Sequence, residues 1–508
     1  MKNLLTTLLY SITIVSVSFA QTATLKVNLK NTSLNKFSVW IPKLSIGRDY
    51  LKKSFFEVPL DKDNTASYTF PITEPKFVNI YCRSSNLNTS STLNYQLYLS
   101  PGDSITLKAD FKKPNYGITV TGKGSNNNQP LLALIQEDDI QKFDGDTTPN
   151  RVIAFIKNRE FVNKKNIKEY VKLYKPDVSF LNAYQLNSSY YFINSYFSFK
   201  ENNKFQIGES YKRNFKKWQY VQDSIFKISK IDNSSALTTS NYTSFIRDFL
   251  LREKERLWQE SAEHQEDFYK KWYNTDVKTG AVLYNQDNQN LLKEKIINNT
   301  FTGKTAEYLH ACVIDEALYE ANPNNIVLIF ENFKSKYPES AYISWYEPAV
   351  NAIKINQEHQ KLTETMVFAN NNGLNFNSLN DVLALVKGKT VLLDMWGTWC
   401  GPCRQEMEKN DKYLKEHFKD KGLDYLYIAN YDQKNEEKWK ELIAYFHLDG
   451  THILANEKLN KDIMDKVKGT GYPTYVVIKK DGSYELSKAG YPMNRAVLIQ
   501  QLEKAIAQ

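Results

Sequence analysis

The sequence predicts a multi-domain protein with an N-terminal antiparallel β-sandwich, an α-helical middle region and a C-terminal α/β domain. Three observations predict this order. Apolar and polar residues alternate through roughly the first hundred positions, which is typical of half-buried strands. Apolar residues then recur at helical spacing. Finally, strand-like and helix-like segments alternate, as in a domain with a central sheet. A chain of 508 residues has room for about three domains.

The first 20 residues resemble a secretory signal peptide. Lys2 supplies a positive start, and Leu4 to Val17 form an apolar core. Ser18 and Ala20 place small residues before an expected cleavage site after Ala20. The alternative is an uncleaved anchor helix, but this segment is short for a span of about 20 apolar residues. We therefore expect an exported chain that does not span the membrane once the signal peptide is removed.

Residues 21–125 form the expected β-sandwich. The alternating runs are Leu25 to Leu29, Phe37 to Ile41, Tyr95 to Leu99 and Ile105 to Phe111. The turn Pro101-Gly102-Asp103 separates the last two runs. Period two with such turn residues indicates antiparallel strands that bury one face. Several strands at short spacing favour a small sandwich.

Residues 126–355 form the expected helical domain. Apolar residues recur three, four and seven positions apart between Phe245 and Trp258, and a similar stripe runs from Ile326 through Leu328 to Phe333. We expect these stripes to be buried between helices. No chemistry is indicated in this region.

The net charge of +9 is mild for a chain of this length. Lys2 is the only charged residue in the expected signal peptide, so its removal leaves +8. No basic run with interleaved aromatic residues indicates a nucleic-acid-binding face. We therefore predict no nucleic-acid partner.

The chain has only four cysteines, too few for a secreted fold held together by disulfides. Cys82 and Cys312 lie in apolar runs, and we expect both to be buried thiols that pack like small apolar side chains. A bridge between them stays open, because sequence alone does not fix connectivity.

Residues 356–508 form the expected α/β domain, with residues 356–370 as its link. The expected strands are Thr390 to Met395, Leu423 to Ala429, Thr474 to Ile478 and Tyr484 to Ser487. The expected helices are Cys400 to Phe418, Glu436 to Phe446, and a last one that Asn494 caps and that ends near Ala507.

The motif Cys400-Gly401-Pro402-Cys403 lies between an expected strand and an expected helix. Two intervening residues allow a small disulfide ring at the start of the helix, where the dipole and free backbone N–H groups stabilise a thiolate. A thiol of pKa about 8.5 is about 3% ionised at neutral pH, whereas a pKa near 7 makes it about half ionised. The pattern predicts a redox pair in which one sulfur attacks other disulfides and the second resolves the mixed disulfide.

Other sites that use paired cysteines fit less well. A zinc site needs four ligands, and no second pair of cysteines or histidines accompanies Cys400 and Cys403. His447 and His452 are expected to be ordinary surface or core residues. A c-type haem site needs His after the second cysteine, where Arg404 stands. We predict neither a metal nor a cofactor.

A larger set of residues carries a family resemblance. The set comprises Gly388-Lys389, Trp396-Gly397-Thr398-Trp399, the two cysteines, Arg404, Glu406 and Gly471-Tyr472-Pro473-Thr474. On these motifs, residues 370–508 resemble the thioredoxin fold, specifically the exported TlpA/ResA-type thiol–disulfide oxidoreductases. The preceding region resembles, less closely, the N-terminal extensions of Gram-negative relatives.

The resemblance implies roles for individual residues. Cys400 is the exposed nucleophile and Cys403 the buried resolving thiol. Asp394 falls where thioredoxins hold a buried carboxylate beneath the disulfide. Burial raises a carboxyl pKa, so Asp394 can accept a proton from Cys403; the alternative is an exposed acid at the end of a strand. Pro473 aligns with the cis-proline beside the disulfide, and the alternative is a trans proline in a turn.

The same resemblance implies a peptide-binding edge. Tyr472 and Thr474 offer backbone groups to an extended client peptide, while Trp399 either shields the disulfide or simply packs beside it. Two departures stand out. Glu408 replaces a proline that kinks the helix in relatives, so we expect a straighter helix. No lysine near residues 426–430 matches the one that pairs with the buried carboxylate in cytosolic thioredoxins.

We predict an exported, periplasmic thiol–disulfide oxidoreductase that acts mainly as a reductant of client-protein disulfides through Cys400 and Cys403. Isomerase or oxidase action stays open. The family resemblance implies a membrane electron donor. The alternative is a binding protein whose N-terminal domains capture a ligand or partner, with the thioredoxin domain as a scaffold.

Overall fold

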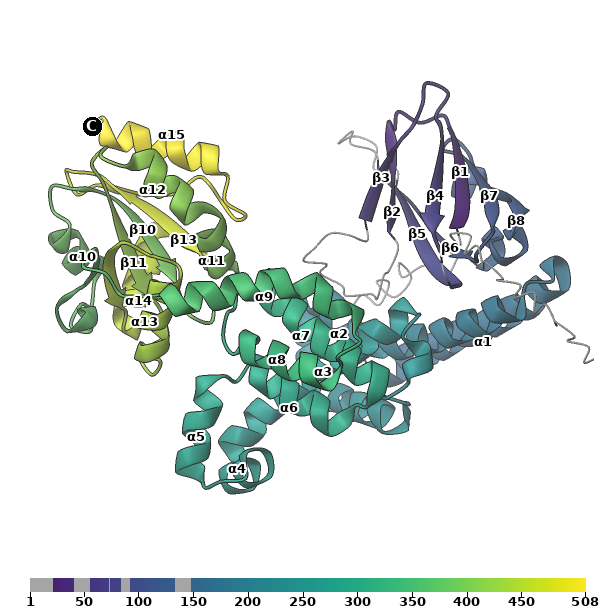
Figure 1. The fold of residues 1–508 in the computed structure, drawn as a ribbon, viewed down its shortest axis with the longest axis horizontal. Helices are drawn as coiled ribbons and strands as arrows, with labels where there is room; N and C mark the ends of the chain where they lie inside the picture. Colours follow the sequence, from purple (N-terminus) through teal and green to yellow (C-terminus); the bar gives the residue numbers. More distant parts are fainter. Residues whose placement is uncertain (1–21, 41–54, 73, 84–91, 133–147) are drawn as a thin grey trace, which may run out of the picture. The chain divides into compact units, whose positions relative to one another are not determined.

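The structure is a computed structural model that describes residues 22–40, 55–72, 74–83, 92–132 and 148–508. The expected signal peptide, residues 1–20, lies outside these ranges. The chain forms two compact units, and the division falls between Ile246 and Arg247. The first unit holds two β-sheets and the helices that follow them, and the second holds further helices and the α/β region (Figure 1).

The first unit contains two four-stranded sheets, with the orders β4-β1-β7-β8 and β3-β2-β5-β6. Their strands are β1 (Thr22–Lys30), β2 (Lys36–Trp40), β3 (Phe55–Pro59), β4 (Thr65–Pro71), β5 (Lys76–Arg83), β6 (Thr92–Leu99), β7 (Ser104–Asp110) and β8 (Thr119–Lys123). The predicted sandwich is confirmed. Its pairing is not wholly antiparallel, however, because β1 runs parallel to β7.

The alternation along β1 builds the core of the sandwich. Ala23, Leu25, Val27 and Leu29 are buried, and the polar residues between them are half-buried or exposed. These four side chains join one apolar cluster with residues of the other sheet, such as Val39. Full burial of each large aliphatic side chain stabilises the fold by about 1.5–3 kcal/mol.

Helices follow the sheets, as predicted for the middle of the chain. They are α1 (Pro149–Tyr174), α2 (Val178–Ile228), α3 (Ser240–Glu263), α4 (Gln265–Tyr273), α5 (Val277–Gln286), α6 (Asn290–Thr300), α7 (Gly303–Tyr319), α8 (Ile326–Lys336) and α9 (Ala341–His359). Across the ranges that the structure describes, no helix is long and apolar enough to cross a membrane.

Two apolar residues that were expected in the helical cores lie at the surface. On α3, Phe245, Ile246 and Leu257 are buried, but Trp258 is 63% exposed. On α8, Leu328 is 52% exposed. The prediction that both stripes are fully buried is therefore wrong at their edges, where single exposed apolar side chains are common in folded proteins.

The C-terminal region is built on a six-stranded sheet with the order β14-β13-β10-β11-β12-β9. Its strands are β9 (Met366–Phe368), β10 (Thr390–Trp396), β11 (Leu423–Ala429), β12 (Gly450–Leu454), β13 (Thr474–Ile478) and β14 (Tyr484–Leu486). Its helices are α10 (Leu379–Leu385), α11 (Gly401–Glu406), α12 (Lys412–Phe418), α13 (Glu436–Tyr445), α14 (Glu457–Val467) and α15 (Arg495–Ile506) (Figure 1). The predicted α/β domain is confirmed.

Side chains of β10 alternate between the two faces of this sheet. Leu393 and Met395 pack in the cluster that α10 and α14 complete. Leu392 packs with α12 and α15, and Trp396 packs with α11 and α13. Because successive side chains in a strand point to opposite faces, Asp394 shares the face of Leu392 and Trp396. Asp394 therefore lies on the sheet face covered by the helical segment that follows the cysteines. This segment, made of α11, a π-helical turn and α12, is called the cysteine helix.

Within residues 356–508 the expected elements are found within one or two residues of their predicted ends, but four elements were missed. The missed elements are β9, α10, β12 and α14. The strand β9 lies inside residues 356–370, which were expected to be only a link, and pairs with β12 at the edge of the sheet. With three and five residues, these strands are too short to show a clear period.

The helix that follows the cysteines is not a regular α-helix. Met407–Asp411 forms a π-helical turn between α11 and α12, and Glu408, at the position where relatives carry a proline, lies within it. From Glu408 in place of a proline we expected a straighter helix, and no residue pattern predicted the π-helical turn. Single π-helical turns occur frequently at functional sites.

The two remaining cysteines are buried free thiols, as predicted. Cys82 is 1% exposed and Cys312 is 6% exposed. Burial raises the pKa of each thiol to about 12. Folded oxidised protein should therefore show no fast-reacting thiol at pH 8, and two per chain after unfolding in guanidinium. Thiol titration with a chromogenic disulfide measures this number, and a Cys82→Ser variant should show one. Rapid labelling of the folded protein would contradict this expectation.

Candidate redox site

The redox motif follows the strand β10, which is buried along its whole length. All seven residues from Thr390 to Trp396 are buried. Gly397 follows, and a Cβ atom at this position would overlap the indole of Trp399. The glycine therefore leaves room for the Trp399 indole between the strand and the cysteine helix.

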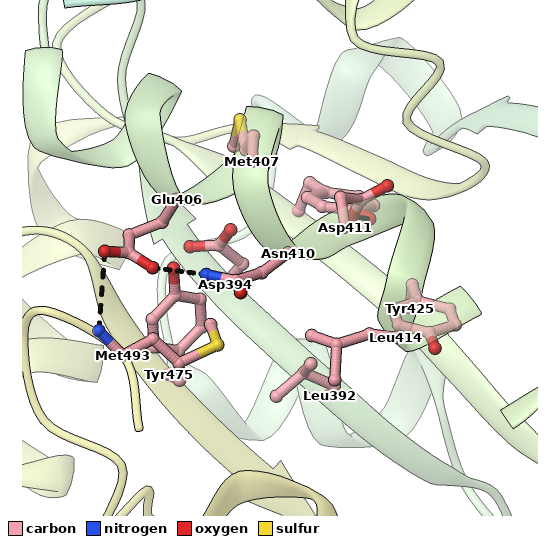
Figure 2. Close-up of a pocket in the computed structure, with 11 residues that line it drawn as sticks. Leu392, Asp394, Glu406, Met407, Asn410, Asp411, Leu414, Tyr425, Tyr475 and Met493 are labelled. Atoms are coloured by element: carbon pink, nitrogen blue, oxygen red, sulfur yellow. Dashed lines mark hydrogen bonds between the residues drawn. The ribbon is translucent and has the colours of Figure 1, made fainter. Parts of the chain in front are cut away.

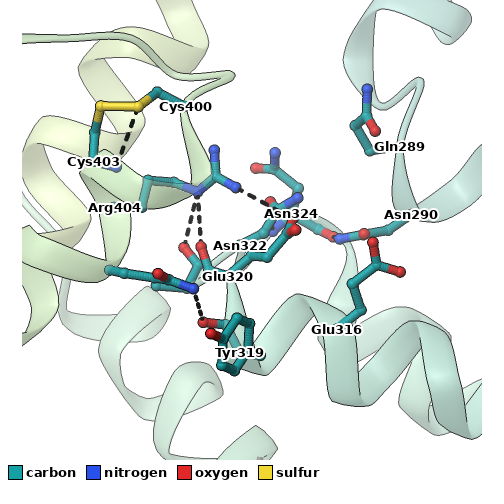
Figure 3. Close-up of polar contacts among 12 residues, drawn as sticks. Gln289, Asn290, Glu316, Tyr319, Glu320, Asn322, Asn324, Cys400, Cys403 and Arg404 are labelled. Atoms are coloured by element: carbon teal, nitrogen blue, oxygen red, sulfur yellow. Dashed lines mark hydrogen bonds and ion pairs between the residues drawn. A yellow bond between two sulfur atoms is a disulfide. The ribbon is translucent and has the colours of Figure 1, made fainter. Parts of the chain in front are cut away.

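The two cysteines form the predicted disulfide at the start of that helix. Cys400 caps α11, and its Sγ is bonded to Cys403, with the two Cα atoms 5.3 Å apart. The backbone N–H of Cys403 donates to the Sγ of Cys400 at 3.2 Å (Figure 3). After reduction, this N–H and the helix dipole stabilise a thiolate on Cys400.

Both cysteines are buried in this disulfide form. Cys400 is 3% exposed and Cys403 is 1% exposed, so the prediction of an exposed Cys400 is wrong for this structure. The reason is packing, since both residues belong to an apolar cluster with Trp396 and Met407, against which Tyr472 also packs.

Trp399 lies at the surface beside the cysteines, with 52% of the residue exposed. Its Nε1–H donates to the backbone oxygen of Asn430 at 2.9 Å. Its ring contacts those of Tyr472 and Tyr431, with centroids 5.6 and 6.1 Å away. Trp399, Tyr431 and Tyr472 thus form an aromatic surface next to the disulfide. Tyr431 had no sequence signal as part of this surface.

The loop before β13 lies next to the end of β10. The Tyr472–Pro473 peptide bond is cis. Thr474 pairs with Met395 of β10, and its hydroxyl donates to the backbone oxygen of Gly471 at 2.5 Å. The hydroxyl of Tyr472 donates to Asn460 at 2.7 Å. These contacts hold Tyr472, Pro473 and Thr474 at the edge of the redox site.

Asp394 is buried on the helix-covered face of β10, so the alternative of an exposed strand-end acid does not hold. Only 6% of the residue is exposed, and its Oδ1 atom has no hydrogen-bond partner. Burial raises the pKa of the carboxyl well above 3.8, and the nearby acids Asp411 and Glu406 raise it further. A carboxyl of this kind holds a proton more tightly than an exposed one.

Arg404 joins the cysteine helix to the end of α7. Its Nε donates to the backbone oxygens of Glu320 and Ala321 at 3.2 Å each (Figure 3). Its Nη1 donates to the backbone oxygen of Thr398 at 2.5 Å. The next residue, Gln405, donates to the backbone oxygen of Tyr319 at 2.7 Å. The last carbonyl groups of a helix lack hydrogen-bond donors within that helix. At the end of α7, the side chains of Arg404 and Gln405 on the cysteine helix are these donors.

Acidic side chains compensate the buried charge of Arg404. Glu320 lies 4.0 Å from its Nη2 atom, and Asp432 also interacts with it. Asp432 accepts hydrogen bonds from the backbone N–H and the hydroxyl of Thr398 at 2.7 and 2.5 Å. Burial raises the pKa of Asp432 and lowers the pKa of Arg404. The sequence marked Arg404 as part of a motif but carried no signal for Glu320 or Asp432.

Metal ligation is not indicated in the described part of the chain. No group of three or more His, Cys, Asp or Glu side chains is arranged there to hold a metal ion. His452 is buried, its ring nitrogen Nε2 lies 2.7 Å from the backbone oxygen of Leu448, and burial lowers its pKa to about 4. His447 is exposed.

The segment that contains this site is similar to known thioredoxin-like proteins. Residues 388–484 match the thioredoxin-like family model. The chain is 31% identical over 96 residues to the thioredoxin-like protein YneN of Bacillus subtilis, covering 19% of this chain and 54% of that protein. It is 41% identical over 100 residues to the thiol-disulfide oxidoreductase ResA of the same organism, covering 20% and 52%. The solved thioredoxin domain of a Bacteroides vulgatus thiol-disulfide oxidoreductase is 26% identical, covering 25% of this chain and 84% of that one, with a TM-score of 0.21.

These similarities concern the C-terminal region. The chain spans about half the length of the two curated relatives, and the matched segments are about a fifth of this chain. Residues 388–484 form a thioredoxin-like domain, as the sequence motifs predicted.

The raised pKa of Asp394 predicts a pH-dependent stability. Below the pKa of the unfolded chain both states hold the proton, and as pH rises through the interval up to the folded pKa the folded protein loses stability. Each pKa unit of separation amounts to about 1.4 kcal/mol. Asp394→Asn should therefore flatten this decline and raise the free energy of unfolding at pH 8, measured by urea titration at several pH values.

The matched control for that experiment is Asp424→Asn. Asp424 lies on the neighbouring strand β11 but its side chain is 47% exposed and pairs with Lys389 at 2.6 Å. This variant should keep the wild-type pH dependence. An Asp394→Asn protein that lost stability in parallel with wild type as pH rose would contradict a raised pKa.

The contacts of Arg404 predict a stability loss on a conservative change. Arg404→Lys keeps the charge but cannot reach the same carbonyl groups, because lysine lacks the planar fork of donors. We expect a loss of about 1–3 kcal/mol in the free energy of unfolding, the cost of leaving buried acceptors without donors. Arg256→Lys, at a side chain that is 49% exposed, should change it by less than about 0.5 kcal/mol. Equal losses in the two variants would refute the anchoring role.

Proposed function

We propose that this protein is an exported thiol–disulfide oxidoreductase that reduces disulfides of client proteins through Cys400 and Cys403. One observation carries the proposal: the Cys400–Cys403 disulfide closes the N-terminus of α11. A buried acid lies on the sheet face that this helix covers, and its pKa is raised. This arrangement supplies a stabilised thiolate and a proton acceptor. The likeness of residues 388–484 to thioredoxin-like proteins supports it.

The reaction follows from the roles of three side chains. The Cys400 thiolate attacks one sulfur of a client disulfide and forms a mixed disulfide, and the other client sulfur leaves as a thiolate. Cys403 then loses its proton to Asp394 and attacks Cys400. The bond between Cys400 and the client breaks, and the client departs with both sulfurs reduced. Two electrons pass from the protein to the client, and the protein keeps the disulfide.

The dipeptide between the cysteines favours the reducing direction. Gly401 and Pro402 are the residues found in thioredoxin, whose potential is about −270 mV against about −120 mV for the oxidant DsbA. At about 1.4 kcal/mol for each 30 mV, this gap is about 7 kcal/mol. A reductant must itself be reduced after each cycle, and we propose a membrane reductase as the electron donor.

The proposed location is the periplasm. The signal-like segment 1–20, with cleavage after Ala20, supports export, and an oxidising compartment supplies disulfide-containing clients. We propose that residues 21–125 and 126–355 are the sandwich and helical domains of the mature chain and that residues 356–508 are the redox domain.

Client binding is proposed at the edge of the redox site. The aromatic surface of Trp399, Tyr431 and Tyr472 can cover apolar side chains of a client, and aromatic residues contribute large contact areas. Next to it, the backbone of Tyr472 and Thr474 can pair with an extended client segment, with Pro473 between them. Thr474 already pairs with β10, which fixes this edge in place.

A binding function is the second candidate, and one observation favours it. A cavity of about 610 Å³ lies between α1 and α2 in the first unit, with Ile153, Ile193, Val221 and Ile225 among its lining residues. A pocket of this size and apolar character can hold a small ligand. In that case the thioredoxin-like domain would be only a scaffold.

Insulin reduction separates the two functions. Wild type should accelerate the precipitation of insulin by dithiothreitol, and Cys400→Ser should fall to the rate without protein, because the attacking sulfur is lost. Cys312→Ser, which alters a buried free thiol far from the motif in sequence, should keep the wild-type rate. Wild-type and Cys400→Ser rates that both equal the background would instead favour the binding function.

A trapping experiment identifies the clients. Cys403→Ser keeps the attacking sulfur but removes the resolving one, so mixed disulfides between Cys400 and clients should accumulate in the periplasm. Non-reducing electrophoresis shows them as adducts that dithiothreitol releases. The double variant Cys400→Ser/Cys403→Ser should form none, and adducts in that variant would argue against attack by Cys400.

A further inference from the structure

The helical segment after the disulfide leads from the buried cysteines to partly exposed side chains. Cys403, Met407, Asp411 and Lys415 follow one another along α11, the π-helical turn and α12. Met407 packs in the apolar cluster of the two cysteines. It also lines a small cavity that reaches Asp411 (Figure 2).

The cavity connects two acids of the site. Asp394 and Asp411 both line it, together with Met407 and Tyr425 (Figure 2). About 20 Å³ of it is open to the centre of a water molecule, which is enough for one water. Two buried polar atoms on its wall, Oδ1 of Asp394 and the hydroxyl of Tyr425, have no hydrogen-bond partner. A water in this cavity could donate to Oδ1 of Asp394.

Asp411 stands between the cavity and solvent. Its side chain is 12% exposed, and its Oδ2 lies 2.7 Å from Nζ of Lys415, whose side chain is 17% exposed. Its Oδ1 accepts a hydrogen bond from the hydroxyl of Tyr427 at 2.5 Å. The Lys415 ammonium also lies over the rings of Tyr425 and Tyr427, 5.6 and 5.4 Å from their centroids. Asp411 is thus fixed by a cation and a hydroxyl.

The position of Tyr427 explains the missing lysine. Tyr427 pairs directly with Asp394 across β10 and β11, within the segment where the sequence shows no counterpart of the thioredoxin lysine. Its hydroxyl reaches Asp411 instead. The cation of this site, Lys415, comes from the cysteine helix rather than from the strand.

We propose that Asp411 is the outlet for the proton that Asp394 receives from Cys403. This inference rests on the proposed reductase function. When Cys403 attacks the mixed disulfide, its S–H bond breaks and the proton joins the Asp394 carboxylate. The proton then passes through one water to the Asp411 carboxylate and from there to bulk solvent. Asp394 returns to its ionised form, and no electron moves in this transfer.

The surroundings of the two acids favour this route. Asp394 is faced by Asp411, Glu406, Tyr427 and Tyr475. Glu406, the other acid on the cavity wall, is 3% exposed and accepts hydrogen bonds from the side chain of Asn410 and, at 3.4 Å, from the backbone N–H of Met493. Asp411 has the larger exposure of the two acids and can exchange protons with water.

Asp411 is faced by Lys415 and Asp449, by Asp394, and by the hydroxyl groups of Tyr425, Tyr427 and Tyr475. Burial raises the pKa of Asp411, whereas Lys415 and Tyr427 lower it. Since Asp394 has no cation among the groups that face it, Asp411 is the better place for a negative charge. It is a positioning residue in this scheme, because it acts through Asp394.

The test compares Asp411→Asn with Asp424→Asn, the exposed control on β11. Two quantities are measured between pH 5 and 9: the alkylation rate of Cys400 in the reduced protein, and the rate at which Cys403 releases a preformed mixed disulfide between Cys400 and a model thiol. Asp411→Asn should slow release at least about tenfold at pH 7, within the range for acid–base assistance. It should leave alkylation within about twofold. Asp411→Glu should restore release.

A second readout needs no client. Infrared titration of the protonated-carboxyl band, assigned with Asp394→Asn, reports the protonation of Asp394 directly. Asp411→Asn should move its midpoint to lower pH, because a neighbouring negative charge is removed. Tyr427→Phe, which removes only the hydroxyl bonded to Asp411, should slow release less than Asp411→Asn does.

Failure of the proton outlet at Asp411 and failure of the proposed reductase function would give different results. Release rates and infrared midpoints of Asp411→Asn that equal those of Asp424→Asn overturn the outlet. If wild type reduces no client but its infrared midpoint responds to Asp411→Asn, the reductase function fails and the connection between the two acids is supported. Slow release with an unchanged pH profile and no rescue by Asp411→Glu means a structural role only, and also overturns the outlet.

Discussion

The alternation of side chains along β10 is the constraint on which the redox site depends. Leu393 and Met395 fill one core, so Asp394 must point to the opposite face, under the cysteine helix. A shift of one residue in the pairing of β10 would exchange the two faces. Pairing with β11 on one side and β13 on the other holds the register. The burial that raises the pKa of Asp394 is therefore a consequence of sheet geometry.

The cysteine helix is also held from outside the thioredoxin-like domain. Arg404 and Gln405 donate to the carbonyl groups that end α7. A helix end needs external partners for these groups, and a buried guanidinium needs acceptors for its N–H groups. The carbonyl groups of α7 and the N–H groups of Arg404 and Gln405 are therefore hydrogen-bond partners of one another. The helical region thus contributes to the placement of the cysteines. This connection makes the helical region part of the redox site's support.

The sequence predicted the elements whose signals are local. The apolar run before Cys400, the strand at residues 423–429 and the helix cap at Asn494 all match the structure. It did not predict β9 or β12, whose pairing depends on residues far apart in the chain. The missed α14 did carry an amphipathic signal, with Leu459, Ile463 and Val467 at four-residue steps. The partners of Arg404 and the burial of Cys400 could not be predicted, because both depend on tertiary packing.

Asp394 of β10 and Asp411 of the cysteine helix line the same cavity. Burial raises the pKa of both carboxyl groups, and a negative charge on one makes it harder for the other to ionise. Asp411 contacts the Lys415 ammonium and the Tyr427 hydroxyl, so it is the acid best able to hold a negative charge. The acid with an unpartnered oxygen, Asp394, is the one that favours the proton. The difference between the two surroundings therefore sets where a proton rests when the cysteines change their oxidation state.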